Sequence, residues 1–363
     1  MTANLLNKFR PFSSVADDVY HADERAGAYE WWYFDALSDD GRDCLVVIFL
    51  IGFIFSPDYN RAVDNYLSDN GQPSPRPSDY PALAVTLYRD GRPLYRAINQ
   101  FTAPDFYADT KKTACRIGDS RFYLDETRYV LELDAVLRGG KRLMGSFVWE
   151  VVQSSKFKVQ SSKLQVQSPD SPESKHSWNL VAPRCRVSGE LRVNGARVLN
   201  FNGNGYHDHN HDSRWLPATV AAWEWGRAHF AGETTAIYYR YREHGAEEAN
   251  CYLFLDTKEG LQTYPARLIE ARPKRHHFGL RYPRELTVET ENARLEITQR
   301  RVIDGSFFYL RCQDVATLEF NDGAKHSALA VTEQLAPQAL RYRWLDWLVK
   351  MRIGRKGRGA FLP

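Results

Sequence analysis

Short runs of alternating apolar and polar residues recur along almost the whole chain. In such a run, successive side chains lie on opposite faces of an extended strand. Residue pairs that end in glycine, such as Asp90-Gly91 and Asn194-Gly195, separate many of these runs and favour tight hairpins. Helical periodicity is found only near the C-terminus. The sequence therefore predicts an all-β protein made of sandwiches or barrels.

The chain of 363 residues is long enough for two domains, each with its own core. A fresh set of strand-like runs follows Trp215-Leu216-Pro217, so we place the two domains at residues 1–212 and 213–336. Residues 154–176 are rich in Ser, Gln and Lys, and we expect them to form an exposed insertion in the first domain. Residues 337–363 form a basic tail.

Composition and missing motifs argue against several classes of function. The net charge of +3 does not favour a nucleic-acid partner. The aromatic fraction of 13% suits strands and a cavity for an apolar ligand. The chain contains no P-loop, no glycine-rich dinucleotide fingerprint and no Gly-x-Ser-x-Gly elbow. Phosphoryl transfer, nicotinamide redox chemistry and serine hydrolysis are therefore unsupported, and we expect no cofactor.

The expected location follows from the cysteines and from the apolar segments. The five cysteines are far apart in the sequence, which is typical of buried reduced thiols rather than of a disulfide framework. The first residues contain no apolar stretch before a small-residue cleavage site. The most apolar run, Cys44 to Phe55, is too short for a membrane-spanning helix. We expect a cytoplasmic protein whose membrane contact, if it has any, is peripheral.

The tail carries apolar residues at helical spacing among basic ones. The apolar positions are Leu340, Trp344, Trp347, Leu348 and Met351. An amphipathic helix of this kind suits the surface of an anionic membrane, here the inner membrane. The alternative is a helix that packs on the second barrel and ends in a solvated basic segment. The sequence leaves both interpretations open.

The segment from Gly203 to Asp212 concentrates ionisable side chains in a strand-like run. One face of the strand would carry Tyr206, Asp208 and Asn210. The other face would carry His207, His209 and His211. Three imidazoles could bind zinc, but a single strand supplies a third ligand only with distortion, so we expect no metal. We favour proton donors and acceptors in a pocket; mutual hydrogen bonding at a domain interface is the alternative.

The segment Glu30-Trp31-Trp32-Tyr33-Phe34-Asp35 mixes acids with aromatic rings, and Trp223-Glu224-Trp225 repeats that mixture. Two adjacent tryptophans cannot both be buried in one core layer, so one of them is expected to line a second surface or a cavity. Facing rings can hold a cation, although aromatic filling of a barrel is the alternative. We assign substrate binding to Glu30, Trp31, Trp32, Tyr33, His207, Trp223 and Trp225.

At these residues the chain resembles the carotenoid 1,2-hydratase family, also called hydroxyneurosporene synthase. The resemblance rests on Glu30-Trp31-Trp32-Tyr33, on Trp178 and on Gly203 to Asn210, and it extends over most of residues 25–335. Where the family continues Asn-Trp-Gly, this chain has Asn210-His211-Asp212. The resemblance implies two lipocalin-like antiparallel β-barrel domains without a metal or organic cofactor, here followed by a C-terminal amphipathic helix.

The resemblance also implies a hydro-lyase that adds water to the terminal double bond of an acyclic carotenoid or related isoprenoid. Protonation of such an alkene requires a strong acid, an aromatic wall and a positioned water. We assign the acid to Asp208, with His209 orienting it or accepting a proton from the water. Tyr206 and Asn210 would hold that water.

Two alternatives remain open from the sequence. The first is a cofactor-free cyclase or pericyclase acting on a polyene, because fungal relatives of similar architecture catalyse cycloadditions. The second is a lipid- or pigment-binding lipocalin without catalytic activity. In each case the partner is a hydrophobic small molecule.

Overall fold

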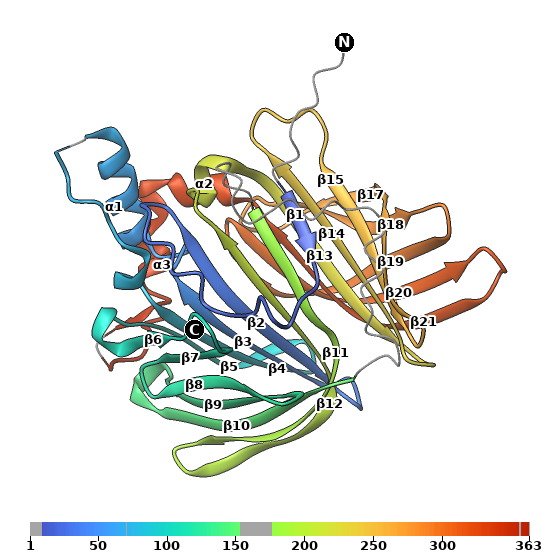
Figure 1. The fold of residues 1–363 in the computed structure, drawn as a ribbon, viewed down its shortest axis with the longest axis horizontal. Coiled ribbons are helices and arrows are strands. Elements are labelled where there is room, and N and C mark those ends of the chain that lie inside the picture. The colour runs from blue at the N-terminus through green and yellow to red at the C-terminus, as the bar shows by residue number, and fades with distance from the viewer. Residues whose placement is uncertain (1–8, 70, 153–175, 356, 363) are drawn as a thin grey trace.

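Extended strands make up most of the protein, as the alternating sequence pattern predicted. The computed structural model describes residues 9–69, 71–152, 176–355 and 357–362. Within these residues the strands form two sheets, each curled into a half-barrel, and helices are few (Figure 1). The prediction of an all-β, lipocalin-like fold is confirmed. The expected insertion at residues 154–176 lies, apart from His176, outside the described residues.

The first sheet contains thirteen strands from residues 9–212 and from the tail. Their bounds are β1 Phe9–Phe12, β2 Tyr29–Ser38, β3 Asp43–Ile51, β4 Ala82–Arg89, β5 Arg92–Gln100, β6 Phe106–Ala108, β7 Ala114–Ile117, β8 Ser120–Asp125, β9 Arg128–Val136, β10 Arg142–Val151, β11 His176–Val193, β12 Ala196–Asp212 and β22 Gly354–Arg355. The order is β22-β5-β4-β3-β2-β12-β11-β10-β9-β8-β7-β6, with β1 on β11. The adjacency of β2 and β12 brings the two unusual sequence motifs together.

The second sheet contains nine strands. Their bounds are β13 Val220–Phe230, β14 Thr234–Glu243, β15 Asn250–Thr257, β16 Gly260–Pro265, β17 Arg267–Arg275, β18 Arg281–Glu289, β19 Ala293–Gly305, β20 Tyr309–Phe320 and β21 Lys325–Leu335. The order is β16-β15-β14-β13-β21-β20-β19-β18-β17. The chain passes from one sheet to the other after β12. Whether residues 1–212 and 213–336 fold as independent domains stays a prediction.

The helices are short and lie at the ends of strands. They are α1 Pro57–Ser68, α2 Leu216–Thr219, α3 Asp346–Lys350 and the 3₁₀ turns η1 Pro77–Asp79, η2 Ala103–Asp105, η3 Arg138–Gly140, η4 Pro337–Arg341 and η5 Arg343–Leu345. The predicted C-terminal amphipathic helix is therefore divided into η4, η5 and α3, because Tyr342 has a non-helical ψ of 86°. No helix in the described part of the chain combines the length and apolarity needed to cross a bilayer.

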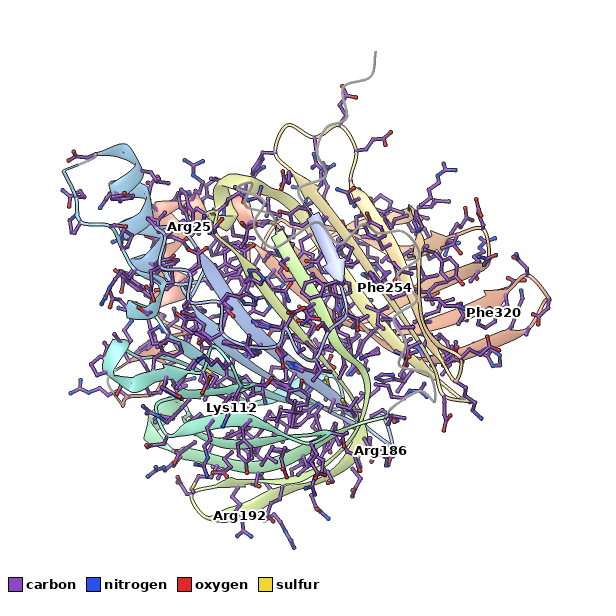
Figure 2. The ribbon with its side chains drawn as sticks, viewed as in Figure 1. Arg25, Lys112, Arg186, Arg192, Phe254 and Phe320 are labelled. Atoms are coloured by element: carbon purple, nitrogen blue, oxygen red, sulfur yellow. The ribbon has the colours of Figure 1, made fainter. Side chains whose placement is uncertain are left out.

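Three large apolar cores and a small fourth cluster, at Tyr59, Val63 and Trp215, stabilise the fold. One core fills the concave side of the first sheet, a second lies between the two sheets, and a third lies within the second sheet. Side chains occupy the space between the sheets, whereas Arg186 and Arg192 lie at the outside of the first sheet (Figure 2). All five cysteines are free thiols and four are buried, as predicted. The core between the sheets contains the candidate site.

Candidate active site

The two motifs are neighbours because β2 pairs antiparallel along its whole length with the second part of β12, from Gly203 to Asp212. Trp31 lies opposite Asn210, Trp32 opposite His209, and Tyr33 opposite Asp208. Opposed residues of an antiparallel pair share a face of the sheet. Each face of this strand pair therefore collects side chains from both motifs.

The alternation of the strands divides the motif residues into two groups. Trp32 and Phe34 belong to the core inside the first sheet. Trp31, Tyr33 and Tyr206 belong to the core between the sheets. We call the first group the inner face and the second group the interface face. Because neighbouring residues of a strand point to opposite sides, Asp208 and His209 lie on different faces.

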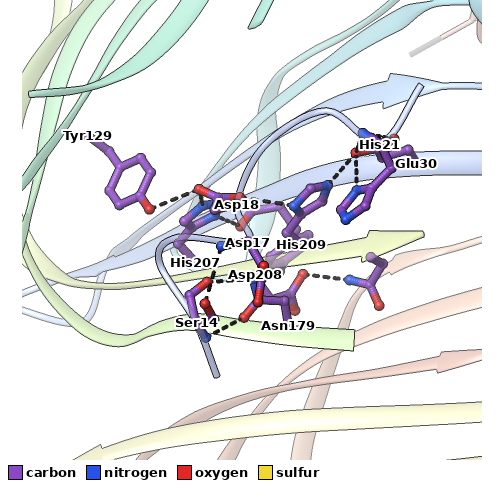
Figure 3. A network of polar contacts seen from close by, with 12 residues as sticks. Ser14, Asp17, Asp18, His21, Glu30, Tyr129, Asn179, His207, Asp208 and His209 are labelled. Carbon is purple, nitrogen blue, oxygen red and sulfur yellow. Dashed lines mark hydrogen bonds and ion pairs between the residues drawn. The ribbon is translucent and has the colours of Figure 1, made fainter. Parts of the chain in front are cut away.

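A buried polar network occupies the inner face (Figure 3). Asp18 Oδ2 accepts a hydrogen bond from the Tyr129 hydroxyl at 2.9 Å and lies 3.1 Å from His207 Nε2. The other oxygen, Oδ1, lies 3.1 Å from His209 Nδ1. His209 Nε2 lies 2.8 Å from Glu30 Oε1. The His209 ring therefore stands between two buried carboxyl groups.

Opposite charges set the protonation of this network. Burial opposes ionisation of Asp18, but the charges and hydrogen bonds of His207 and His209 prevail and lower its pKa to about 2. Burial likewise disfavours a charged His209, yet Asp18 and Glu30 raise its pKa to about 9. The pKa of Glu30 is lowered by His209 and His21 despite its burial. The inner face is thus a set of paired ions at neutral pH.

Part of this network has the composition of a metal site. Among the described residues, ligand atoms of His21, Glu30 and His209 lie within 4.8 Å of one another. Two imidazoles and a carboxylate suit zinc or iron. However, Glu30 Oε1 already lies 2.9 Å from His21 Nδ1 and 2.8 Å from His209 Nε2. Hydrogen bonds through Glu30 Oε1 thus already join the three groups.

On the interface face, Asp208 is surrounded by neutral donors, whereas the buried Asp35 on the same face is paired with Arg227. Asp208 Oδ2 accepts hydrogen bonds from the Tyr206 hydroxyl at 2.7 Å and from Trp178 Nε1 at 3.1 Å. The amide of Asn210 donates to Oδ1 at 2.8 Å. Burial raises the pKa of Asp208 to about 7, since these neutral donors offset only part of the desolvation. Asp208 can therefore hold or release a proton at neutral pH.

A cavity of about 300 Å³ lies between the sheets, and Tyr33 and Tyr206 stand between it and this carboxyl group. Trp31 and Tyr33 of β2 and Trp223 of β13 form one side of it. The Trp31 and Trp223 rings are stacked, with centroids 5.4 Å apart. Strands β3 to β5, the β19–β20 connection and the tail supply the other, mainly apolar sides. The cavity matches the apolar ligand pocket expected from the aromatic content.

Two polar clusters interrupt the apolar wall of the cavity. In the first, Glu333 accepts hydrogen bonds from the Tyr33 hydroxyl at 2.8 Å and from the guanidinium of Arg311. In the second, Asp304 accepts a hydrogen bond from the Tyr88 hydroxyl at 2.8 Å and pairs with Arg96 at 2.6 Å. Burial raises the pKa of Glu333, although Arg311 opposes the rise. These clusters are the ionisable groups nearest to a bound ligand.

The structure brings together some of the predicted site residues and separates others. Trp31, Tyr33 and Trp223 line the cavity. A layer behind them holds Tyr206, Asp208, Asn210 and Trp225, and the Trp225 indole donates to the Tyr206 hydroxyl at 3.2 Å. Glu30, Trp32, His207 and His209 lie on the inner face, away from the cavity lining.

His209 does not face Asp208, although the sequence interpretation paired them. Its two ring nitrogens point to Asp18 and Glu30, and its ring stacks on Trp32. The reason is the strand alternation itself, which sends adjacent residues to opposite faces. The role suggested for His209, as a partner of the acid, is therefore not compatible with this arrangement.

Sequence reasoning missed three residues. Asp18 lies in a loop before β2 and has no periodicity to mark it. Arg311 and Glu333 lie on β20 and β21 at ordinary alternating positions. The one available signal was an arginine and a glutamate inside otherwise apolar strand runs, which resembles the pattern of any half-exposed strand.

The sequence also matches a family of known proteins. The sequence model of the family described as "Carotenoid hydratase CrtC" matches residues 47–361. A hydroxyneurosporene dehydrogenase from Chlorobaculum tepidum is 28% identical over 352 residues, which cover 94% of this chain and 91% of that protein.

The chain is also similar in sequence to a second enzyme and in fold to a solved structure. An acyclic carotenoid 1,2-hydratase from Thiocapsa roseopersicina is 28% identical over 229 residues, covering 60% of this chain but only 49% of that protein. A crystal structure of an AttH-type protein from Nitrosomonas europaea superposes with a TM-score of 0.61 at 16% identity, covering 90% of this chain and 97% of the other. That likeness shows a shared fold.

Proposed function

Because this chain belongs to the carotenoid hydratase family CrtC, we propose that it adds water to the terminal double bond of an acyclic carotenoid or related isoprenoid. Hydration of such a bond begins when an acid protonates one carbon and leaves a tertiary cation on the other. The observation that carries the proposal is Asp208, a buried acid with a pKa of about 7 beside an aromatic cavity.

Asp208 is the proposed proton donor. With a pKa of about 7, a large fraction of its carboxyl group carries a proton at neutral pH, unlike an exposed aspartate. Tyr206 and Asn210 contact this carboxyl group directly, so their proposed role is to orient it. His209 takes no direct part because it lies on the inner face.

The aromatic rings are proposed to stabilise the cation that protonation creates. Tyr33 and Trp225 pack edge to face with centroids 5.5 Å apart, next to the stacked rings of Trp31 and Trp223. The negative faces of such rings attract a positive charge, with a stabilisation of about 2 kcal/mol where water is excluded. Positioned aromatic walls also keep stray water from the cation.

The substrate must reach Asp208 past one layer of rings. Tyr33 lines the cavity and packs edge-on against Tyr206 at 6.1 Å, and Tyr206 hydrogen-bonds Asp208. The proposal therefore requires one of these rings to swing aside when the alkene enters. A cavity of about 300 Å³ holds the end of a long polyene and leaves the rest outside.

The test is incubation of the purified protein with acyclic carotenoids in detergent, followed by mass spectrometry. We expect a product heavier by one water, and in deuterium oxide one deuterium on the carbon next to the new alcohol. A product of unchanged mass would indicate cyclisation instead. Binding without any product, across carotenoids and shorter isoprenoids, would indicate a carrier and overturn the proposal.

We further propose peripheral membrane contact through the tail; a cytoplasmic location stays a prediction. Trp344 and Trp347 are 72% and 56% exposed, and Tyr342 and Phe361 are exposed nearby in sequence. Leu348, from the same short helix as Trp347, lines the cavity. Exposed aromatic rings beside a cavity for an apolar ligand suit the interface of a bilayer.

Three basic side chains of the tail pair with acids elsewhere in the protein. Lys350 and Arg355 both contact Asp58, and Arg343 contacts Asp64. We therefore expect the rings rather than the charges to dominate binding. Sedimentation with neutral and with anionic lipid vesicles should show binding to both, reduced about tenfold in a Trp344→Ser/Trp347→Ser variant. No sedimentation with either vesicle would contradict membrane contact.

A further inference from the structure

The Tyr33–Arg311–Glu333 cluster is an unusual feature of an otherwise apolar cavity. Arg311 and Glu333 lie directly opposite each other on β20 and β21, and their side chains are 3% and 15% exposed. An ion pair removed from water stabilises a fold only weakly, because desolvation offsets the attraction. A purely hydrocarbon ligand would gain nothing from charged groups in its wall.

The guanidinium of Arg311 is held in place but is not fully hydrogen-bonded. Its Nε donates to the Tyr309 hydroxyl at 2.8 Å, and Nη2 donates to Glu333. The rings of Tyr33, Tyr88 and Tyr309 lie between 5.6 and 6.0 Å from its central carbon. The remaining nitrogen, Nη1, is buried without a hydrogen-bond partner. A buried charged donor without an acceptor is unfavourable.

The cluster also lies on the reacting side of the cavity. Tyr33 donates to Glu333 from β2 and is the cross-strand neighbour of Asp208. An alkene placed against Tyr33 would therefore have the acid on one side and the carboxylate on the other. This arrangement suits addition of two fragments, a proton and a water oxygen, across one double bond.

We propose that Tyr33, Arg311 and Glu333 form an oxygen-binding subsite, which holds the attacking water and then the tertiary hydroxyl of the product. This inference rests on the proposed hydration. Arg311 Nη1 donates to the oxygen, Tyr33 donates to Glu333 and so holds that carboxylate in place, and Glu333 is the catalytic base.

The step balances without any further reagent. Asp208 gives its proton to one alkene carbon, and the water oxygen forms a bond to the cationic carbon. The oxygen then carries two hydrogens and a positive charge. One of these protons passes to the Glu333 carboxylate, which leaves a neutral alcohol. Glu333 then loses the proton to solvent and Asp208 regains one, so that the net change is addition of one water.

The subsite is tested by ligand selectivity, which does not depend on turnover. An acyclic isoprenoid hydrocarbon and its tertiary alcohol are titrated separately, and binding is followed by quenching of tryptophan fluorescence, since Trp31 and Trp223 line the cavity. We expect the wild type to bind the alcohol about tenfold more tightly. In Glu333→Gln the two ligands should bind within about twofold of each other.

Glu333→Gln leaves Arg311 without its counter-ion, which can cause misfolding. A second variant therefore serves as a control for this effect. Arg311→Met/Glu333→Leu removes both charges together, which buried pairs tolerate well. It should also lose the preference for the alcohol. Asp314→Asn is the matched control, since Asp314 is a buried acid of the same sheet outside the cavity lining. It should keep the tenfold preference.

Measurements of turnover test the subsite and the proposed hydration separately. If the wild type hydrates the hydrocarbon, both variants should lose about a hundredfold in kcat with little change in KM. Hydration at wild-type rate and selectivity in both variants would overturn the subsite and leave the function intact. If the wild type forms no alcohol, the subsite is still supported when the wild type binds the alcohol preferentially and the variants do not. If the wild type shows no such binding preference, the subsite is refuted.

Discussion

Asp18 and Asp208 are two buried aspartates on opposite sides of the same strand pair, and their protonation differs completely. Asp18 has a pKa of about 2 and Asp208 a pKa of about 7. Both side chains are almost fully removed from water. Desolvation therefore raises the pKa of each, and the difference must come from their partners.

The partners of the two carboxyl groups differ in charge. Asp18 faces the imidazoles of His207 and His209, which can carry positive charge. Asp208 faces the neutral donors Tyr206, Trp178 and Asn210. The inner face thus holds His209 as an ion paired with the carboxylates of Asp18 and Glu30. The interface face retains a carboxyl group whose proton is available for chemistry.

The largest effect that would test this contrast is expected for Asp208→Asn. Asparagine keeps the shape of the side chain but has no acidic proton, so kcat should fall about a thousandfold, or roughly 4 kcal/mol of transition-state stabilisation. The measurement is the initial rate of alcohol formation from an acyclic carotenoid. The fold should be unchanged by circular dichroism.

Asp314→Asn is the matched control for that loss. Asp314 is buried, burial raises its pKa to about 7, and it accepts a hydrogen bond from Thr332. The same chemical change is thus made at a carboxyl group outside the cavity lining, and activity should stay within about twofold of wild type. Equal losses in the two variants would show that Asp208 acts only through stability.

The next largest effect is expected on stability from Asp18→Asn. Breaking a buried ion pair leaves the imidazolium of His209 with one carboxylate fewer, and the free energy of unfolding should fall by about 3 kcal/mol. Urea denaturation measures it, with the exposed Asp39–Arg186 pair as reference, where Asp39→Asn should cost under about 0.5 kcal/mol. Activity per folded molecule should persist. A specific loss of kcat would place the inner face in the mechanism.

The sequence was sufficient for the class of fold. Alternation with a period of two and glycine-bearing turns specify strands and hairpins wherever tertiary contacts do not override them. The tail is the exception, since five apolar residues at helical spacing did not produce one helix. There, packing of Leu340 and Leu345 and pairing of β22 with β5 decided the path of the chain.

The contents of the site could be predicted only in part. Alternation correctly placed Asp208 with Tyr206 and Asn210, because that is a property of one strand. Which strands lie next to each other, and which loop covers them, depends on long-range topology that periodicity does not carry. Asp18, Arg311 and Glu333 were missed for this reason, and so was the true environment of His209.

The pH dependence of stability gives a third and smaller effect. Asp208 has a pKa of about 7 in the folded protein against 3.8 for its model value. Between these values only the unfolded chain has lost the proton, so stability falls as pH rises, by about 1.4 kcal/mol per unit. From pH 5 to pH 8 Asp208→Asn should gain about 2 to 3 kcal/mol relative to wild type.

Asp18, on the inner face, is expected to affect the pH dependence of stability differently from Asp208. Asp18 has a lowered pKa, so the stability that it contributes is present above its unfolded pKa and is lost only as pH falls towards 2. Asp18→Asn should nevertheless show its largest deficit near pH 5, and the deficit should shrink above pH 6.5, because Asp18 also supports the raised pKa of His209. Parallel urea titrations of both variants measure the two slopes. Identical slopes would mean that the carboxyl groups titrate alike.

The smallest effect is expected at the outer edge of the inner network, from His21→Ala. His21 Nδ1 lies 2.9 Å from Glu30 Oε1, but its side chain is 29% exposed and water can take its place. Glu30 keeps its contact with His209, so the free energy of unfolding should fall by only about 1 kcal/mol, and kcat/KM should stay within about twofold. Urea denaturation and carotenoid turnover measure the two quantities on one preparation. A tenfold loss of kcat/KM with stability intact would mean that the Glu30–His209–Asp18 chain supports the reaction from behind the sheet, and the division between a structural face and a chemical face would no longer hold.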